Sequence, residues 1–374
     1  MYETLTTPPA DKLLGLEALR FIAAFDVLIW HYQHFAYVAD TPVDLVKARF
    51  PFHDLLYPFY EFGGMGVWVF WCISGFIFFW KYRDAISDRS IGAWTFFVAR
   101  LSRLYPLHFV TLMMVASLQP IYRHFQGGVF VYPIDIQKFV LQLFMASDWS
   151  PHPRFSFNAP IWSVSVEVLV YVVFFLTLRF VTKSPLLNVI VVLVCATMGS
   201  PIGFCLSCFY AGGLAAIGRQ AIARSPFRPL IEAALWCAAV AGPVSIWMLS
   251  LQSRIDYCTF LLYTLILLFC LSGRLPLSPP WQRLLQAAGS MTYSSYLLHF
   301  PIQLLIALAF TILQRPIPLT DDLFFVAFVA ATMLAAFVSY HTFEVPAQTL
   351  LRGLLLSTQG SLPATPDPRS VPAR

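Results

Sequence analysis

The stretch ALRFIAAFDVLIWHYQHF, residues 18–35, is the part of the sequence that decides the fold. It is apolar enough to enter a lipid bilayer, yet it carries Arg20, Asp26, His31 and His34. A charged side chain at mid-membrane costs about 2.5–3.5 kcal/mol on insertion scales, so such groups are rare and usually functional. We therefore predict a transmembrane helix that carries part of a functional site.

The composition of the whole chain indicates the same class of protein. Of its 374 residues, 58% are hydrophobic and 11% are charged, and the mean hydropathy is +0.69. A soluble domain has about 25% charged residues. Apolar runs of roughly 20 residues, the length that spans a bilayer, recur along the sequence and do not alternate as the strands of a β-barrel do. The predicted fold class is all-α, as a polytopic membrane protein.

We expect about ten transmembrane helices within residues 1–350, followed by a disordered, Pro- and Ser-rich cytoplasmic tail at 351–374. Most of the 24 Lys and Arg residues fall in loops on the side of the N-terminus, so both termini are predicted to be cytoplasmic. Residues 82–106 are expected to form a basic amphipathic helix at the membrane surface. The expected spans lie near 13–37, 60–80, 104–120, 160–180, 185–200, 203–219, 230–250, 257–273, 287–313 and 322–343.

Two of the ionisable groups in the first span share one helix face. Arg20 and His31 are eleven residues apart, which at 100° per residue is about 1100°, close to three full turns. Together with Glu17 and His34 they predict a polar seam from the inner surface to beyond the midplane, whereas Asp26 points elsewhere. The alternatives are a snorkelling arginine at the membrane boundary and a structural histidine that bonds a neighbouring helix.

The segment ARLSRLYP places Arg100 and Arg103 three residues apart, so they are neighbours on a helix surface. Each guanidinium can bind a phosphate through two parallel hydrogen bonds. The pair therefore predicts a site for a phosphate-bearing ligand at the cytoplasmic mouth of the third span. The alternative is an ordinary positive anchor at the inner surface.

Two further apolar segments contain polar side chains at helical spacing. In IWSVSVEVLVY, Glu167 has Ser163 one turn before it and Tyr171 one turn after it. Glu167 is either the partner of a buried cation or a functional carboxylate. In SMTYSSYLLHFP, three side chains share one face, and the histidine taken alone would also suit a satisfied interior group: Tyr293, Tyr296 and His299.

Taken in order, these segments resemble the acyltransferase 3 family of bacterial membrane acyltransferases. GLEALRFIAAFDVLIWHY is similar to the first helix of that family, RLSRLYP to its Arg-x-x-Arg element, WSVSVEVLVY to its glutamate segment and TYSSYLLHFP to its histidine segment. GGMGVWVFWCISGF and FEVP, at 343–346, also resemble family motifs. The resemblance covers roughly residues 11–350. Asp26 and Val168 depart from it, at positions where an aliphatic residue and a second acid are usual.

The resemblance implies a membrane-embedded O-acyltransferase. Such an enzyme moves an acyl group, commonly acetyl, from acyl-coenzyme A to a hydroxyl of a sugar or cell-envelope glycan. By the resemblance, the catalytic residues are His31, Arg20 and Glu167. Acyl-coenzyme A would be bound by Arg100, Arg103 and Arg20. The candidates for the acceptor or oxyanion site are His299, Tyr171, Tyr296 and Ser163.

His31 is expected to act as a general base or to carry the acyl group itself. The expected location is the bacterial inner membrane, with acetyl-coenzyme A as the donor. No tightly bound cofactor, metal or nucleic acid is expected, and a homo-oligomer is left open. The competing interpretation is a transporter or flippase for a lipid-linked saccharide, which the lack of a clear internal repeat disfavours.

Overall fold

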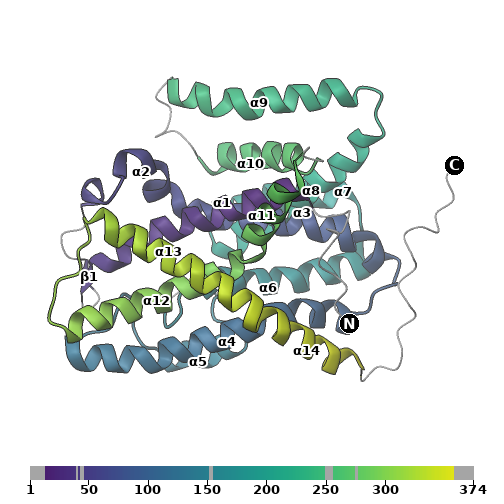
Figure 1. Cartoon of the computed structure of the whole chain (residues 1–374). Coiled ribbons are helices and arrows are strands. Elements are labelled where there is room, and N and C mark those ends of the chain that lie inside the picture. The colour runs from purple at the N-terminus through teal and green to yellow at the C-terminus, as the bar shows by residue number, and fades with distance from the viewer. Residues whose placement is uncertain are drawn as a thin grey trace.

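Figure 1 shows the computed structural model of the chain, a bundle of helices. The structure describes residues 13–38, 41–42, 46–150, 155–248, 256–273 and 277–357. Within these ranges, the strands are β1 (Tyr37–Val38) and β2 (Thr41–Pro42), which pair antiparallel with Tyr37 opposite Pro42. The all-α prediction is therefore confirmed for the described part of the chain.

The helices lie close to the predicted spans. The α-helices are α1 (Leu14–Trp30), α2 (His53–Phe62), α3 (Gly66–Ser87), α4 (Ala93–Gln126), α5 (Ile136–Leu143), α6 (Ile161–Leu176), α7 (Pro185–Ala196), α8 (Pro201–Ala223), α9 (Arg228–Met248), α10 (Tyr257–Leu271), α11 (Pro279–Ser290), α12 (Thr292–Ile312), α13 (Asp322–Ser339) and α14 (Val345–Ser357). The 3₁₀-helices are η1 (His31–Ala36), η2 (Lys47–Arg49) and η3 (Gly63–Met65), and the π-helical turns are η4 (Thr177–Val181) and η6 (Tyr340–Glu344).

A helix lies at each of the ten places where a span was predicted. Six stretches of the described chain are both long and apolar enough to cross a membrane, whereas α7 and α10 are apolar but shorter. A multi-pass membrane protein is thus supported, while the number of ten spans and the side of the two termini stay predictions. The six stretches are His53–Ser87, Ala93–Gln126, Ile161–Val181, Pro201–Ala223, Thr292–Ile312 and Asp322–Leu356.

The structure corrects the prediction for residues 82–106. Helix α3 continues to Ser87 and α4 begins at Ala93, so the predicted surface helix does not form as a separate element. Pro106 and Pro120 lie inside the 34 residues of α4. A proline removes a backbone donor and usually ends a helix in water, but membrane helices accept it because neighbouring groups satisfy the freed carbonyl.

At the C-terminal end, α14 extends to Ser357, beyond the predicted domain boundary at residue 350. Residues 351–357 are therefore helical. The rest of the predicted tail, residues 358–374, lies outside the described residues.

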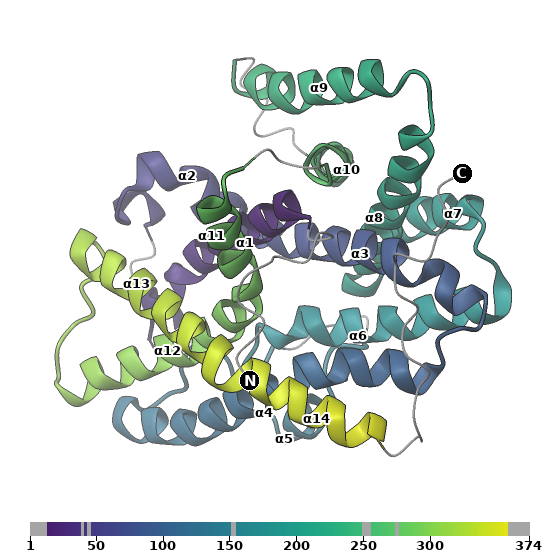
Figure 2. The same cartoon turned by 45° about the vertical axis from the view of Figure 1, so that its right-hand side comes forward.

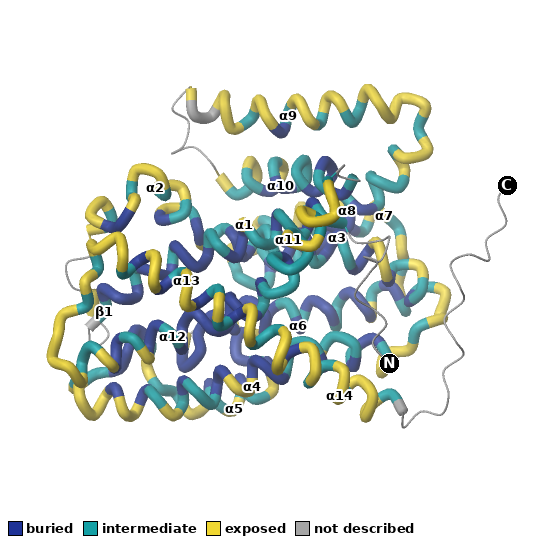
Figure 3. Tube along the Cα trace, viewed as in Figure 1, coloured by how far each residue is buried: buried dark blue, intermediate teal, exposed yellow. Residues whose placement is uncertain are grey.

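The centre of the bundle is the contact between α3 and α8, the most extensive contact between two helices. Figure 3 shows many buried residues in this central region, whereas α9 at the edge is largely exposed. Two glycines allow the close approach of the helices. A Cβ on Gly75 would lie 1.8 Å from the carbonyl oxygen of Phe209, and a Cβ on Gly212 would lie 2.0 Å from that of Cys72. Small residues at such contacts are typical of membrane helices that pack backbone to backbone.

We predict that Gly212→Ala destabilises the fold, because the new methyl group would collide with the backbone of α3. Overpacking of this kind costs about 1–3 kcal/mol of unfolding free energy. The measurement is the midpoint of thermal unfolding in detergent. Gly218→Ala on the same helix is the matched control, since no described atom outside its own helix lies within 4 Å of the place its methyl group would take. Equal midpoints for the two variants would contradict the prediction.

Candidate active site

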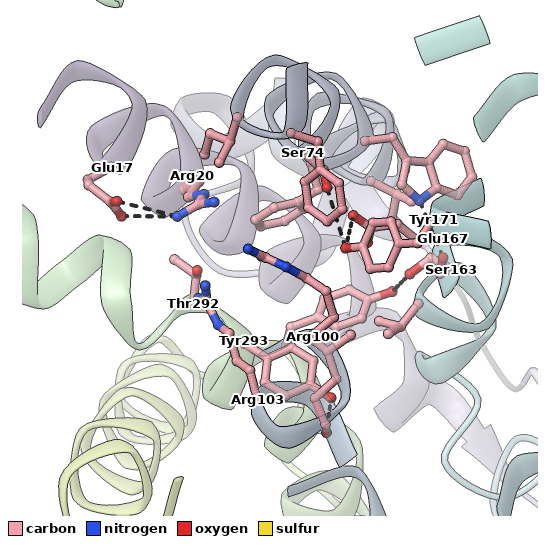
Figure 4. Close-up of a pocket in the computed structure, with 18 of the residues that line it drawn as sticks. Glu17, Arg20, Ser74, Arg100, Arg103, Ser163, Glu167, Tyr171, Thr292 and Tyr293 are labelled. Carbon is pink, nitrogen blue, oxygen red and sulfur yellow. Dashed lines mark hydrogen bonds and ion pairs between the residues drawn. The ribbon is translucent and has the colours of Figure 1, made fainter. Parts of the chain in front are cut away.

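A cavity of about 310 Å³ lies among α1, α3, α4, α6 and α12. Figure 4 shows the side chains that line it. These helices are far apart in the sequence, so the cavity is a product of tertiary packing. It brings together most of the predicted site residues, namely Arg20, Arg100, Arg103, Ser163, Glu167, Tyr171 and Tyr296.

One side of the cavity is basic. Figure 4 shows the guanidinium groups of Arg20, Arg100 and Arg103 gathered there. Arg20 is held by the residue one turn before it: its Nη1 atom lies 3.3 Å and 3.4 Å from the two carboxylate oxygens of Glu17. Four basic side chains and two carboxylates line the whole cavity, the others being Lys81 and Glu167. The cavity therefore favours an anionic ligand.

Arg100 is fixed by aromatic rings. Its guanidinium carbon lies 4.6 Å from the ring centroid of Phe78 and 4.9 Å from that of Tyr82. Its Nη2 also donates to the hydroxyl of Tyr82. A cation over an aromatic face gains about 0.5–2 kcal/mol, more where water is excluded. These contacts hold one arginine of the predicted phosphate-binding pair in a defined position.

The opposite side of the cavity carries the predicted carboxylate. The hydroxyl of Tyr171 donates to Oε1 of Glu167 at 2.6 Å, which is the contact that the one-turn spacing predicts. The same hydroxyl lies 3.4 Å from Oγ of Ser74 on α3. The Tyr171 ring stacks on Phe78 at 4.4 Å, so this side and the Arg100 side share one aromatic support. Sequence reasoning missed Ser74, although it lies in a motif that carries the family resemblance.

Tyr296 lines the cavity from α12. Its hydroxyl donates to the carbonyl oxygen of Pro160 at 2.7 Å and accepts from Oγ of Ser163, also at 2.7 Å. The ring is therefore fixed at both its α12 backbone and its hydroxyl. One turn further along α12, the ring of His299 lies 6.0 Å from that of Tyr296.

Three buried histidines lie behind Tyr296. The ring of His31 is 4.6 Å from that of His299 and 4.8 Å from that of His34, measured between centroids. His31 and His299 are not among the residues that line the cavity. The cavity that Arg20 lines therefore does not extend to His31. The polar seam along α1 stays a prediction. Helix α1 ends at Trp30, and His31 is the first residue of η1.

Hydrogen bonds define the histidine tautomers. Nδ1 of His31 lies 2.8 Å from the carbonyl oxygen of Val27, and a carbonyl only accepts, so Nδ1 carries the proton and Nε2 is the basic nitrogen. Nε2 of His299 is buried and has no hydrogen-bond partner among the described residues. Gln303 donates to the carbonyl oxygen of His31 at 2.8 Å and bonds Nδ1 of His34 at 3.2 Å. Gln303 lies one turn after His299 on α12, so helical spacing is the signal that could have found it.

Comparison with known proteins identifies the family. Residues 13–341 match the acyltransferase domain of the acyltransferase 3 family. The chain belongs to this family. The matched range contains every predicted site residue. This agrees with the family resemblance of the sequence motifs.

The chain is also similar to acyltransferase MdmB of Streptomyces mycarofaciens. The two are 28% identical over 189 residues, which is 48% of this chain and 42% of the relative. The alignment thus spans less than half of the length of that relative. No solved structure matches the chain.

We predict that Tyr296→Ala opens the cavity to the buried histidines. Diethyl pyrocarbonate modifies accessible imidazoles, and His299 is fully buried in the structure. Its modification, followed by mass spectrometry of the peptide, should rise at least tenfold in the variant. Tyr293→Ala, which also truncates a ring that lines the cavity, is the control and should leave His299 protected. Unchanged protection in Tyr296→Ala would show that the ring is not the barrier.

Proposed function

We propose that this acyltransferase transfers an acyl group, acetyl in the first place, from acyl-coenzyme A to a hydroxyl of a sugar or cell-envelope glycan at the bacterial inner membrane. The observation that carries the proposal is the basic cavity among α1, α3, α4, α6 and α12, which ends at Tyr296 in front of His299 and His31. It offers cations for a polyphosphate donor at one end and a basic nitrogen beyond the other.

The size of the cavity supports a donor whose narrow pantetheine arm enters the cavity first. Its volume of about 310 Å³ is at the lower limit of pockets that enclose a drug-sized ligand, roughly 300–1,000 Å³. Coenzyme A is larger than this. In the proposal, the pantetheine arm and a short acyl group occupy the cavity, and the phosphates stay with Arg100, Arg103 and Lys81. Because this space is limited, we propose acetyl as the preferred acyl group.

The proposed chemistry uses Nε2 of His31, the nitrogen that the Val27 contact leaves unprotonated. It removes the proton of the acceptor hydroxyl as the oxygen attacks the thioester carbonyl. The new carbon–oxygen bond forms, the carbon–sulfur bond breaks, and the leaving thiolate takes the proton from the imidazolium. A positioned base contributes about 10²–10⁴-fold, so placement of the thioester must supply much of the remaining acceleration. Transient transfer of the acyl group to His31 is the second route.

The proposal requires Tyr296 to move, because its ring lies between the cavity and His299. Moving it breaks the hydrogen bonds to Pro160 and Ser163, and each contributes about 0.5–1.5 kcal/mol net. Moving the ring therefore costs about 1–3 kcal/mol. A conformation at this cost is a minor state, populated at roughly 0.1–10%. Glu167 or His299 would orient the base or stabilise the developing oxyanion.

The test of the function is direct transfer by the purified full chain in detergent. Radiolabelled acetyl-coenzyme A is offered with and without candidate glycans, and label that appears in the glycan requires an enzyme. A transporter or flippase for a lipid-linked saccharide would bind a glycan without labelling it. The acyltransferase description of both matches favours the enzyme.

We predict that His31→Asn abolishes this transfer. Asparagine keeps an N–H donor near the position of Nδ1, so the contact with Val27 can survive, but it has no atom in place of Nε2. The rate of label transfer should fall at least about 10²-fold. His31→Gln is the paired variant, since its amide reaches toward Nε2 but cannot act as a base. Both variants should unfold at the temperature of the natural protein, and full activity in either would refute the assignment.

We predict that Arg100→Gln with Arg103→Gln weakens binding of the donor more than that of the acceptor. Hydrogen bonds to charged groups contribute about 1.5–3 kcal/mol, and about 1.4 kcal/mol is tenfold in affinity. The KM for acetyl-coenzyme A should therefore rise at least tenfold, while the KM for the acceptor changes by less than about twofold. Arg179→Gln, outside the cavity, is the control. Equal changes in both KM values would show that the two arginines do not bind the donor selectively.

A further inference from the structure

A second cavity lies where the ends of α8 and α10 meet the start of α9. Its volume is about 460 Å³, and its walls include Arg219 of α8, Arg228, Glu232 and Trp236 of α9, and Phe269 of α10. It shares no residue with the cavity of the candidate active site. In Figures 1 and 2, α9 lies at the edge of the molecule beside α10. The second cavity is thus at the periphery of the bundle.

The walls of the second cavity carry an excess of positive charge. A single carboxylate oxygen of Glu232 contacts both arginines, at 2.9 Å from Nε of Arg228 and 3.4 Å from Nη1 of Arg219. Two guanidinium groups against one carboxylate leave one positive charge in excess. Each guanidinium has five N–H donors in a fixed fork, and the contacts with described residues use only some of them. The remaining donors suit an anion with several oxygens.

The position of Arg219 is fixed before any ligand arrives. Its guanidinium carbon lies 5.2 Å from the centroid of the Phe269 ring, and its side chain is only 16% exposed. Gly273 lies beside the same guanidinium, so that a Cβ there would be 3.4 Å from Nη2. A positioned arginine loses little side-chain entropy when it binds a phosphate.

The surroundings of the cavity are apolar and exposed. Phe227 and Leu230 are 67% and 70% exposed, and Trp236 in the wall is 43% exposed. Helix α8, which carries Arg219 in its last turns, is one of the stretches long and apolar enough to cross a membrane. Arginines beside exposed aromatic and aliphatic groups at the end of a membrane helix mark the depth of lipid headgroups.

We propose that this second cavity binds the phosphate of an anionic phospholipid. The phosphate oxygens accept from Arg219 and Arg228, and the acyl chains lie along the exposed apolar surface of α9, which includes Val240 and Val244. A volume of about 460 Å³ holds a phosphate and the adjoining glycerol group. A soluble phosphate shares the same chemistry but makes no use of the apolar surface.

Glu232 and the two arginines are expected to have opposite effects on lipid binding. In the bound state its carboxylate repels the phosphate and competes for the same donors. Glu232→Gln should therefore strengthen lipid binding, while Arg219→Gln with Arg228→Gln should weaken it. If the three residues only hold α9 to α8, all these variants lower stability and none changes lipid binding.

The experiment is native mass spectrometry of the purified full chain, titrated with phosphatidylglycerol or with phosphatidylcholine. We expect one phosphatidylglycerol to bind at least tenfold more tightly than phosphatidylcholine. The double arginine variant should lose this preference, and Glu232→Gln should increase phosphatidylglycerol binding severalfold. Arg283→Gln with Arg352→Gln removes the same charge elsewhere and is the matched control.

A competition arm distinguishes the two sources of phosphate. Inorganic phosphate at millimolar concentration should leave the bound phosphatidylglycerol in place, and its displacement would assign the cavity to a soluble anion instead. Equal binding of the two lipids, or an unchanged preference in the double arginine variant, would overturn the proposal. The increase expected for Glu232→Gln cannot arise from misfolding, so the test does not depend on loss of binding alone.

Discussion

An ionised side chain inside an apolar bundle needs a partner or access to water, and this requirement shapes the centre of the molecule. Arg20 is paired with Glu17, Arg100 lies against two aromatic rings, and Glu167 accepts from Tyr171. None of these groups can be covered by aliphatic side chains at low cost. The helices therefore pack around a cavity at this place.

Tight packing elsewhere makes that cavity possible. Gly75 and Gly212 bring the backbones of α3 and α8 into contact, and both helices adjoin the cavity or its aromatic support. Ser74, next to Gly75 on α3, lies 3.4 Å from the hydroxyl of Tyr171 on α6. Helix α3 therefore packs on α8 through its glycine and faces the cavity through the neighbouring serine.

The sequence was most informative where a polar residue interrupts an apolar run. Arg20, Arg100, Arg103 and Glu167 stand out in this way, and all four line the cavity. Helical spacing also placed Tyr171 one turn after Glu167, and the two side chains are in contact in the structure. These inferences depend on a single helix, whose geometry is known in advance.

The sequence failed where the answer depends on other parts of the chain. The sequence placed Arg20 and His31 on one face of a helix, but it could not show that His31 lies outside the cavity that Arg20 lines. Ser74 was missed because a small polar residue does not stand out in a membrane helix. Gln303 was missed although it lies one turn after His299 on the same helix face. The carboxylate of Glu344 accepts a hydrogen bond from Ser294 at 2.5 Å. These two residues lie in segments that only the fold brings together.

The hydrogen bond of Tyr296 has a consequence for the chemistry of its hydroxyl. A phenol has one hydrogen to give, and in this structure the Pro160 carbonyl receives it. While the ring blocks the way to His299, that hydrogen is thus engaged by the backbone and cannot be offered to a negative oxygen. Displacement of the ring would open the path and release the donor in the same movement, which links admission of a reactant to the assembly of a competent oxyanion site.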